Sequence, residues 1–285
     1  MKILSYSLAL IAIFLAISLV LSLYMTRRAK LTEIHSPAEF GMEYEEVTFA
    51  ASDGLQLHGW WIPTPDSNRA VIILHGHGGS MDWDVWRAPP FHAAGFNVLL
   101  FDFRAHGRSQ GKAITFGYLE RRDVVGAVEF LRSRGMRRIG LLGFSLGGIA
   151  AMLATPFSPH VSALISDGGP ARILTALTVW GVERHMPHFL AAALAGMAIT
   201  GASLRMRANL FRCAPLYWVS RISPRPILFI HGEQDQYVPD FDDLYAAALP
   251  PKEVWRLPEA GHTTVGQLYP EEHQRRILAF FQQHL

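Results

Sequence analysis

The sequence has 285 residues, of which 50% are hydrophobic, with 26 Lys and Arg against 24 Asp and Glu. This length suits one large domain, and the formal net charge of +2 is too small to indicate a nucleic-acid partner. The single cysteine, Cys213, excludes an internal disulfide framework, and we expect it to be a small buried side chain.

The first segment of the chain, residues 3–25, is uncharged and long enough to cross a bilayer as a helix. A secretory signal would carry small residues before a cleavage site, and no such site follows, so the pattern favours a retained anchor. Three basic residues come after the segment, while only Lys2 comes before it. The positive-inside rule therefore favours a cytoplasmic location for the rest of the chain. The basic residues are Arg27, Arg28 and Lys30.

Alternating polar and apolar residues over 44–49 and 55–60, separated by Ser52-Asp53-Gly54, predict a β-hairpin at the edge of a sheet. Three nearly continuous apolar runs then predict strands that are covered on both faces, as in a parallel sheet. They are residues 70–74, 97–101 and 139–142.

Helical spacing of apolar residues predicts helices around 86–94 and over 117–134, between the apolar strands. Strands that alternate with helices imply right-handed crossovers and an open, doubly wound sheet. We therefore predict an α/β fold with a mostly parallel central sheet flanked by helices. Further strands are expected at 161–165, 226–230 and 253–257, and a last amphipathic helix at 271–284.

Residues 170–215 interrupt this alternation with a mostly helical and unusually apolar insertion between two strands. We expect the insertion to form a lid over the functional site. That its helices simply pack on the sheet remains an open alternative. Its stretch 190–204 is too short to span a membrane. The predicted division of the chain is an anchor with its flank over 1–30, and an α/β domain over 31–285 that carries the lid.

The string GFSLG at residues 143–147 comes directly after an apolar strand and leads into a helix. A serine between two glycines at such a turn is typical of a nucleophile, since side chains at 143 and 147 would collide with neighbouring backbone. The turn would raise the Ser145 hydroxyl above the sheet. It would also place the backbone N–H of Leu146 at the positive end of the helix, where an oxyanion can be held. By itself the string fits a simple glycine-rich turn equally well.

A serine nucleophile needs a base and an orienting carboxylate, and reactive groups in parallel sheets gather at the carboxyl ends of the strands. Asp235 and His262 each follow one of the last two predicted strands. Ser145, Asp235 and His262 thus occur in the order nucleophile, acid and base, each in a turn after its own strand. Asp167 also follows a strand and is a second candidate for the acid, although Asp235 is favoured.

The string HGHGG at residues 75–79 ends the first apolar strand, and its glycines would let the backbone approach a bound acyl group. The N–H of His77 can join that of Leu146 in an oxyanion hole. A metal shared by His75 and His77 is not favoured, because no third and fourth ligand are apparent. Nothing in the sequence matches a Walker loop or a dinucleotide fingerprint.

Other polar residues near the strand ends are expected to be structural. Asp102 and Arg104 should brace loops by ion pairing, and His75 and His231 should form hydrogen bonds inside backbone turns. A group of three acids resembles a solvated helix start. These are Asp240, Asp242 and Asp243. Six further histidines are expected on the surface or in the lid, namely His35, His160, His185, His188, His273 and His284.

Taken together, these strings resemble the α/β-hydrolase family from about residue 43 to the C-terminus. The strings are HGHGGS at 75–80, DFRAHGRSQG at 102–111, GFSLGG at 143–148, HGEQDQYVP at 231–239 and GHTT at 261–264. Within the family the chain looks most like the bacterial membrane-anchored serine hydrolases related to the Bem46 group and to prolyl-oligopeptidase-like peptidases. It departs from the family pattern in its longer, more apolar lid and in Ala105, where glycine is usual and where we expect little effect.

The resemblance implies that Ser145 is the nucleophile, Asp235 the acid and His262 the base, with the N–H groups of Leu146 and His77 as oxyanion donors. It implies hydrolysis of carboxylic esters or thioesters through an acyl-serine, with a small-molecule or lipid-like acyl substrate and no metal or organic cofactor. The protein would be attached to the bacterial inner membrane by its N-terminal helix. Peptidase activity and a non-catalytic binding scaffold remain alternatives.

Overall fold

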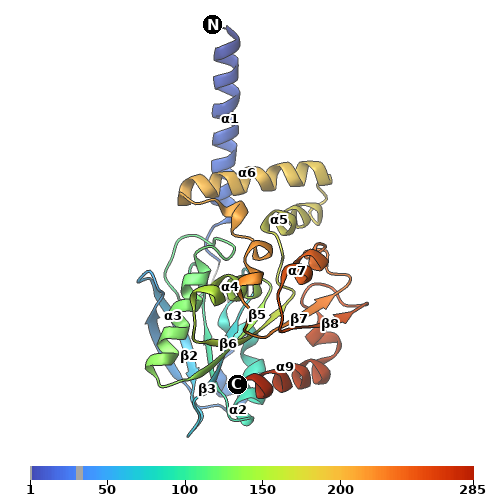
Figure 1. Ribbon diagram of the computed structural model, residues 1–285. Coiled ribbons are helices and arrows are strands. Elements are labelled where there is room, and N and C mark those ends of the chain that lie inside the picture. Colours follow the sequence, from blue (N-terminus) through green and yellow to red (C-terminus); the bar gives the residue numbers. More distant parts are fainter. Residues whose placement is uncertain (1, 30–34) are drawn as a thin grey trace.

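The computed structural model describes residues 2–29 and 35–285, and its centre is an eight-stranded sheet with the order β1-β2-β4-β3-β5-β6-β7-β8 (Figure 1). The strands from β3 to β8 are parallel to one another, whereas β1 and β2 form an antiparallel hairpin at one edge. This confirms the predicted α/β fold. The strands are β1 Glu45–Ala50, β2 Gln56–Ile62, β3 Arg69–Leu74, β4 Asn97–Phe101, β5 Arg138–Phe144, β6 Val161–Asp167, β7 Ile227–Gly232 and β8 Lys252–Leu257.

Helices cover both faces of the sheet because the buried strands are apolar on both sides. In β3, Ile72 and Leu74 contribute to one hydrophobic core and Val71 and Ile73 to the other, as the two-residue period of a strand requires. The first core includes residues of α3 (Glu120–Ser133), α4 (Leu146–Ala154) and α7 (Phe241–Ala247). The second includes residues of α2 (Ala88–Ala93) and α9 (Pro270–His284), and the short helix α8 (Val265–Leu268) precedes α9.

The helix predicted around residues 86–94 is only partly formed. Residues Met81–Arg87 are 3₁₀-helical, and the α-helix α2 begins at Ala88. Pro89 and Pro90 explain this boundary, because proline lacks an N–H group and is tolerated only in the first turn of an α-helix. The predicted helix over 117–134 also begins later, at Glu120, because Gly117 has a φ of +100°.

The apolar insertion between β6 and β7 contains two helices, α5 (Ile173–Val182) and α6 (His188–Met206). The helix α6 runs crosswise over the base of α1 (Lys2–Met25), and α5 lies on the domain side of α6 (Figure 1). By length and composition alone, α1 from Tyr6 onward and α6 are both able to cross a membrane. The expectation that residues 190–204 are too short to span is therefore wrong on length, because the helix extends further at both ends to 19 residues. The predicted boundary between residues 30 and 31 lies outside the described residues.

Candidate active site

Ser145 stands on the sharp turn that joins β5 to α4. Its backbone has a φ of 49° and a ψ of −109°, a combination that non-glycine residues rarely adopt. A Cβ at Gly143 would lie 2.4 Å from the backbone of Gly147, and one at Gly147 would lie 2.1 Å from the carbonyl oxygen of Leu74. This confirms that side chains at 143 and 147 would collide with backbone. The Ser145 amide donates to the carbonyl of Asp167 at 2.9 Å, which ties the turn to β6.

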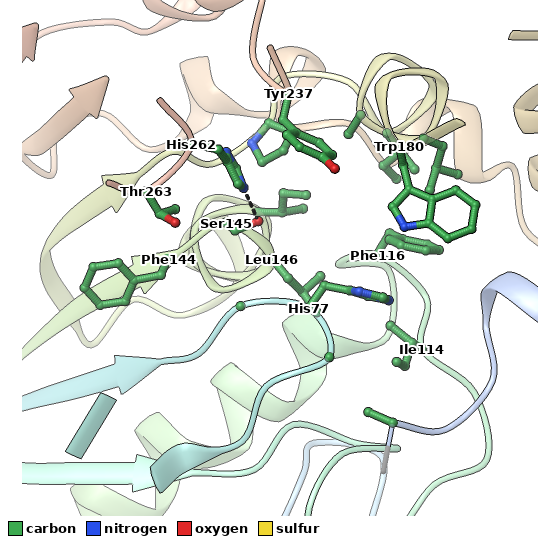
Figure 2. Close-up of a pocket in the computed structure, with 18 of the residues that line it drawn as sticks. His77, Ile114, Phe116, Phe144, Ser145, Leu146, Trp180, Tyr237, His262 and Thr263 are labelled. Carbon is green, nitrogen blue, oxygen red and sulfur yellow. Dashed lines mark hydrogen bonds between the residues drawn. The ribbon is translucent and has the colours of Figure 1, made fainter. Parts of the chain in front are cut away.

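Asp235 and His262 reach Ser145 from the loops after β7 and β8. His262 Nδ1 lies 2.8 Å from Asp235 Oδ2. His262 Nε2 lies 2.9 Å from Ser145 Oγ, the contact drawn in Figure 2. The Asp235 carboxylate accepts from Nδ1–H, so Nε2 is left to accept from the serine hydroxyl. Asp235 is buried, and its Oδ1 accepts from the amide of Tyr237 at 2.9 Å. Three residues that are far apart in the sequence thus form one hydrogen-bonded chain.

The other candidate acid, Asp167, points to a different partner. Its Oδ2 lies 2.9 Å from Nε2 of His273, and both side chains are buried. The expectation that His273 lies on the surface or in the lid is therefore wrong. His273 is four residues before Ile277 on the face of α9 that packs against the sheet, where this contact with β6 is made.

Gly168 is a residue of this site that sequence reasoning missed. Its φ is +62°, and a Cβ there would lie 2.9 Å from Cγ2 of Thr263. The same Cβ would lie 3.4 Å from both His262 Nδ1 and Asp235 Oδ2. A glycine is therefore needed where β6 ends beside the His262–Asp235 pair. The Asp-Gly-Gly string after a buried strand is the sequence signal that could have indicated it.

The predicted oxyanion donors, Leu146 and His77, both lie near Ser145 at the cavity, and their role stays a prediction (Figure 2). Leu146 is the first residue of α4, and His77 lies in the turn after β3, and both line the cavity that contains Ser145. The His77 ring stacks on Phe116, with centroids 5.3 Å apart. Desolvation, with a smaller contribution from His75, lowers the pKa of His77 to about 4, so its ring is neutral at neutral pH.

The cavity has a volume of about 1030 Å³, at the upper end of the range for small-molecule sites. Ser145 and His262 lie on one wall, and Trp180 of α5 and Phe116 lie across the cavity from them (Figure 2). This second wall is mainly hydrocarbon and aromatic, which suits an apolar ligand. The apolar residues that line the cavity outside α4 include Ile114, Phe116, Ile173, Leu177 and Trp180.

The end of α1 forms part of the cavity, which sequence reasoning did not foresee. Tyr24 and Met25 line the cavity. Arg28 lies next to them, and its guanidinium donates to the carbonyls of Ser109 and Gly107 at 2.8 and 2.5 Å. In the sequence Arg28 indicates only a charge that sets membrane orientation, whereas in the structure it ties the base of α1 to the loop after β4.

Several residues near the site are structural, as predicted. Both ring nitrogens of His75 are engaged, by the Gly76 carbonyl at 2.8 Å and the Phe103 amide at 3.1 Å, which leaves neither free for a metal. No group of three or more His, Cys, Asp or Glu able to hold a metal is found among residues 2–29 and 35–285. Cys213 is buried, as expected.

The loop after β4 is braced as expected for Arg104, which pairs with the carboxylates of Asp53 and Asp123. Asp102 acts differently from the prediction, because it accepts from the backbone amides of Met81 and Arg108. Ala105, where the family usually has glycine, adopts a left-handed φ of 57°. The glycine preference therefore reflects a backbone requirement that alanine meets here at some strain.

The acids after β7 lie at the start of α7, as predicted, and they also form ion pairs. Arg172 at the start of the insertion pairs with Asp240 and Asp243, and Arg256 pairs with Asp242. The His231 ring stacks on Phe241 with centroids 4.0 Å apart.

Comparisons with known proteins agree with this geometry. A family model described as the alpha/beta hydrolase family matches residues 71–277. The chain is 28% identical over 271 residues to the uncharacterised protein YfhR of Salmonella typhimurium, covering 88% of this chain and 87% of that protein. It is 28% identical over 224 residues to the alpha/beta hydrolase domain-containing protein WAV2 of Arabidopsis thaliana, covering 75% of this chain and 69% of that protein.

Among solved structures, the esterase Pf2001 of Pyrococcus furiosus superposes with a TM-score of 0.76 and 26% identity, covering 91% of this chain and 98% of the esterase. The family and its esterase neighbours support hydrolase activity, whereas the narrower resemblance to the Bem46 group stays a prediction. With a family model that spans most of the sheet and a matching fold, the chain belongs to the alpha/beta hydrolase family.

Proposed function

We propose that the protein is a serine hydrolase that cleaves carboxylic esters or thioesters through an acyl-serine intermediate. The observation that carries this proposal is the continuous hydrogen-bonded chain from Asp235 through His262 to Ser145, with contacts of 2.8 and 2.9 Å. These are the distances at which a base can take a proton from a hydroxyl. The position of Ser145 on a strained turn that lines a cavity adds to this support.

The proposed reaction uses the three residues in sequence. His262 Nε2 takes the proton of the Ser145 hydroxyl while the oxygen attacks the acyl carbonyl, and Asp235 stabilises the charged imidazole. The oxyanion is held by the backbone N–H groups of Leu146 and His77, and the leaving group takes the proton from His262. Water activated by the same histidine then releases the acyl group, so the cycle uses no metal or organic cofactor.

The cavity walls favour an acyl substrate over a peptide. The side opposite the triad presents hydrocarbon and aromatic side chains such as Phe116, Leu177 and Trp180. A peptide backbone placed there would lose hydrogen bonds to water without gaining partners, whereas an acyl chain gains from the burial. We therefore place α5 and α6 as the predicted lid, with α5 forming part of the acyl wall.

We further propose that α1 is a retained membrane anchor rather than a cleaved signal. The residues after α1 are joined to the domain, since the Ile114 amide donates to the Thr26 carbonyl at 2.8 Å and the Ala29 amide donates to the Ala105 carbonyl at 2.9 Å. Removal of α1 would take Tyr24 and Met25 from the cavity lining and expose the face of α6 that packs on α1. The positive-inside rule, applied to Arg27 and Arg28, favours a cytoplasmic domain.

A fluorophosphonate probe tests the proposed activity, because it reacts with serine hydroxyls that a neighbouring base activates. We expect the full-length protein in detergent micelles to be labelled on one serine, and the Ser145→Ala variant to show no labelling. The Ser166→Ala variant, which removes a buried hydroxyl from the adjacent strand, should label like the wild type. A folded wild type that stays unlabelled would rule the proposal out.

A further inference from the structure

The helix α6 is held across the last turns of α1 by a close backbone contact and two hydrogen bonds. A Cβ at Gly201 would lie 2.1 Å from the carbonyl oxygen of Ser18, so the helices touch backbone to backbone there. The Arg205 guanidinium donates to the hydroxyls of Ser22 and Thr26, at 3.0 and 2.9 Å. The helix α6 is therefore fixed at one level along α1 and crosswise to it (Figure 1).

The level of this crossing coincides with the edge of a bilayer that α1 spans. Ser18 and Ser22 come 16 and 20 residues after Lys2, which is about 24 to 30 Å at about 1.5 Å per residue. The hydrocarbon layer of a bilayer is about 30 Å thick. Arg27 follows the crossing, with its guanidinium 4.5 Å from the centre of the Tyr24 ring, and basic and aromatic residues are enriched at membrane surfaces. Because α6 is crosswise to α1, it would lie in the plane of that surface.

The outward face of α6 has the composition of an interfacial helix. No charged side chain occurs between Phe189 and Leu204, and these two are 77% and 61% exposed. Ala193 is exposed as well, and the three residues lie within about 60° of one another around the helix. An apolar face of this kind is unfavourable in water but is stable when buried at the boundary of headgroups and acyl chains. Basic residues flank both ends, namely Arg184, His185 and His188 on one side and Arg205 and Arg207 on the other.

The cavity extends to the end of α1 and to α5, close to the level at which α6 crosses α1. Tyr24 of α1 and Trp180 of α5 both line it, with their rings 6.4 Å apart. The guanidinium of Arg184, which also lines the cavity, lies 3.5 Å from the centre of the Trp180 ring. Paired aromatic and basic groups at this end of the cavity match the chemistry of the headgroup region of a bilayer.

We infer that α6 is an in-plane helix embedded in the membrane surface and that the cavity receives its substrate from the bilayer. The substrate is a membrane-resident acyl ester, whose hydrocarbon chain enters past Tyr24 and Trp180 while its ester group reaches Ser145. This substrate class rests on the proposed serine hydrolase activity, whereas the embedding of α6 does not.

The depth of α6 can be measured without any catalytic assay. A polarity-sensitive fluorophore is attached to Ala193→Cys in the full-length Cys213→Ala protein, reconstituted in phosphatidylcholine vesicles that contain lipids brominated at defined acyl positions. The control is Gln282→Cys, an exposed position on α9. We expect shallow bromines to reduce the fluorescence at 193 at least twofold and to leave that at 282 unchanged. Equal quenching at both positions, or quenching at 193 that is strongest for bromines at the midplane, would overturn the in-plane embedding.

The source of the substrate is tested by comparing two esters. Ala193→Glu introduces a charge on the embedded face, outside the cavity lining, and Gln282→Glu is its matched control. Against a long-chain ester incorporated in vesicles, we expect Ala193→Glu to be slower than the control by on the order of tenfold. Both variants should hydrolyse a soluble acetate ester at the wild-type rate.

Equal rates for the two variants on the vesicle ester would overturn supply from the bilayer. A wild type that hydrolyses neither ester would instead overturn the proposed function, and the depth measurement would still decide the position of α6.

Discussion

The two walls of the cavity are built in different ways. The strand wall, which contains Ser145 and His262, lies at the carboxyl ends of the strands and is polar. Its side chains are held by hydrogen bonds such as those from His262 to Asp235 and from the Tyr237 amide to the same carboxylate. The helical wall is formed by α5 and the end of α1, with α6 packed behind them. It is held by apolar packing, by the backbone contact of Gly201 with Ser18 and by the hydrogen bonds of Arg205 to α1 and the residue after it. Polar links join the two, among them the Tyr237 hydroxyl, which donates to Glu183, and Arg172, which pairs with Asp240.

This difference in how the walls are held assigns the reaction to the strand wall and the choice of substrate to the helical wall. A proton transfer needs donor and acceptor placed within tenths of an ångström, which hydrogen bonds and a strained turn can provide. An acyl chain needs only apolar area of a suitable shape, which packed helices provide with few constraints on sequence. Changes in the strand wall should therefore abolish the reaction, whereas changes in the helical wall should alter stability or the choice of substrate.

The largest effect should come from a single carboxylate of the strand wall. We expect Asp235→Asn to lower kcat on a soluble ester by on the order of 10⁴-fold, because an amide favours the wrong tautomer of His262. The matched control is Asp167→Asn at the end of the adjacent strand, whose carboxylate contacts His273 instead. It should keep kcat within a few fold of the wild type, as measured by ester hydrolysis after the thermal midpoint of each variant is determined. Comparable losses in the two variants would contradict the assignment of the acid.

A smaller effect, on the free energy of unfolding, should distinguish two glycines of α6, the helix behind the helical wall. At Gly201 a Cβ would meet the Ser18 carbonyl at 2.1 Å, whereas at Gly196 of the same helix nothing lies within 4 Å. We expect Gly201→Ala to lower the free energy of unfolding by about 1 to 3 kcal/mol, since α1 and α6 must separate. Gly196→Ala should raise it by up to about 1 kcal/mol, because alanine is the better helix former. Thermal unfolding in micelles measures both, and a loss that is equal at the two sites would show that α1 and α6 do not touch.

The strand wall could be predicted from the sequence because its requirements are local. Gly143 and Gly147 mark a turn that excludes side chains, and the acid and base each follow an apolar strand. The pairing of Asp167 with His273 could not be predicted, because no motif relates these two residues as it relates the nucleophile, the acid and the base. A local signal did exist for the burial of His273, since it precedes Ile277 by one helical turn on the apolar face of α9.

The helical wall was harder to predict from the sequence. A hydropathy pattern predicts that an apolar helix crosses a membrane, but it gives no face of that helix that contacts protein. It does not show that α1 also packs on protein through Ser18 and Ser22, which are buried and lie four residues apart. Small residues at this spacing in an apolar helix indicate a helix–helix contact, and here they face Gly201 of α6.

The smallest predicted effect is a dependence of stability on pH, which comes from His106 in the loop after β4 on the strand side of the cavity. His106 is fully buried, its Nδ1 lies 3.0 Å from the Arg104 carbonyl, and its Nε2 accepts from the Gly78 amide at 3.3 Å. Desolvation, followed by the nearby His75, lowers the pKa of His106 to about 2, from about 6.5 in the unfolded chain. His77 and Arg28 also face it and act in the same direction.

The neutral His106 ring binds a proton less well in the folded state than in the unfolded state. The contribution of neutral His106 to the free energy of unfolding is therefore complete above about pH 6.5 and is lost as the pH falls below that value. Between pH 7.5 and 5.5 the free energy of unfolding should fall by on the order of 1 kcal/mol through His106. Urea unfolding at the two pH values measures the fall in the wild type and in His106→Gln, whose amide does not titrate. The difference between the two proteins isolates the histidine from other titrating groups.

The helical contact of Gly201 with Ser18 contains no titratable side chain, so the change in stability caused by Gly201→Ala should be the same at both pH values. A Gly201→Ala effect that varied with pH as strongly as the His106 effect would show that the two walls are not independent.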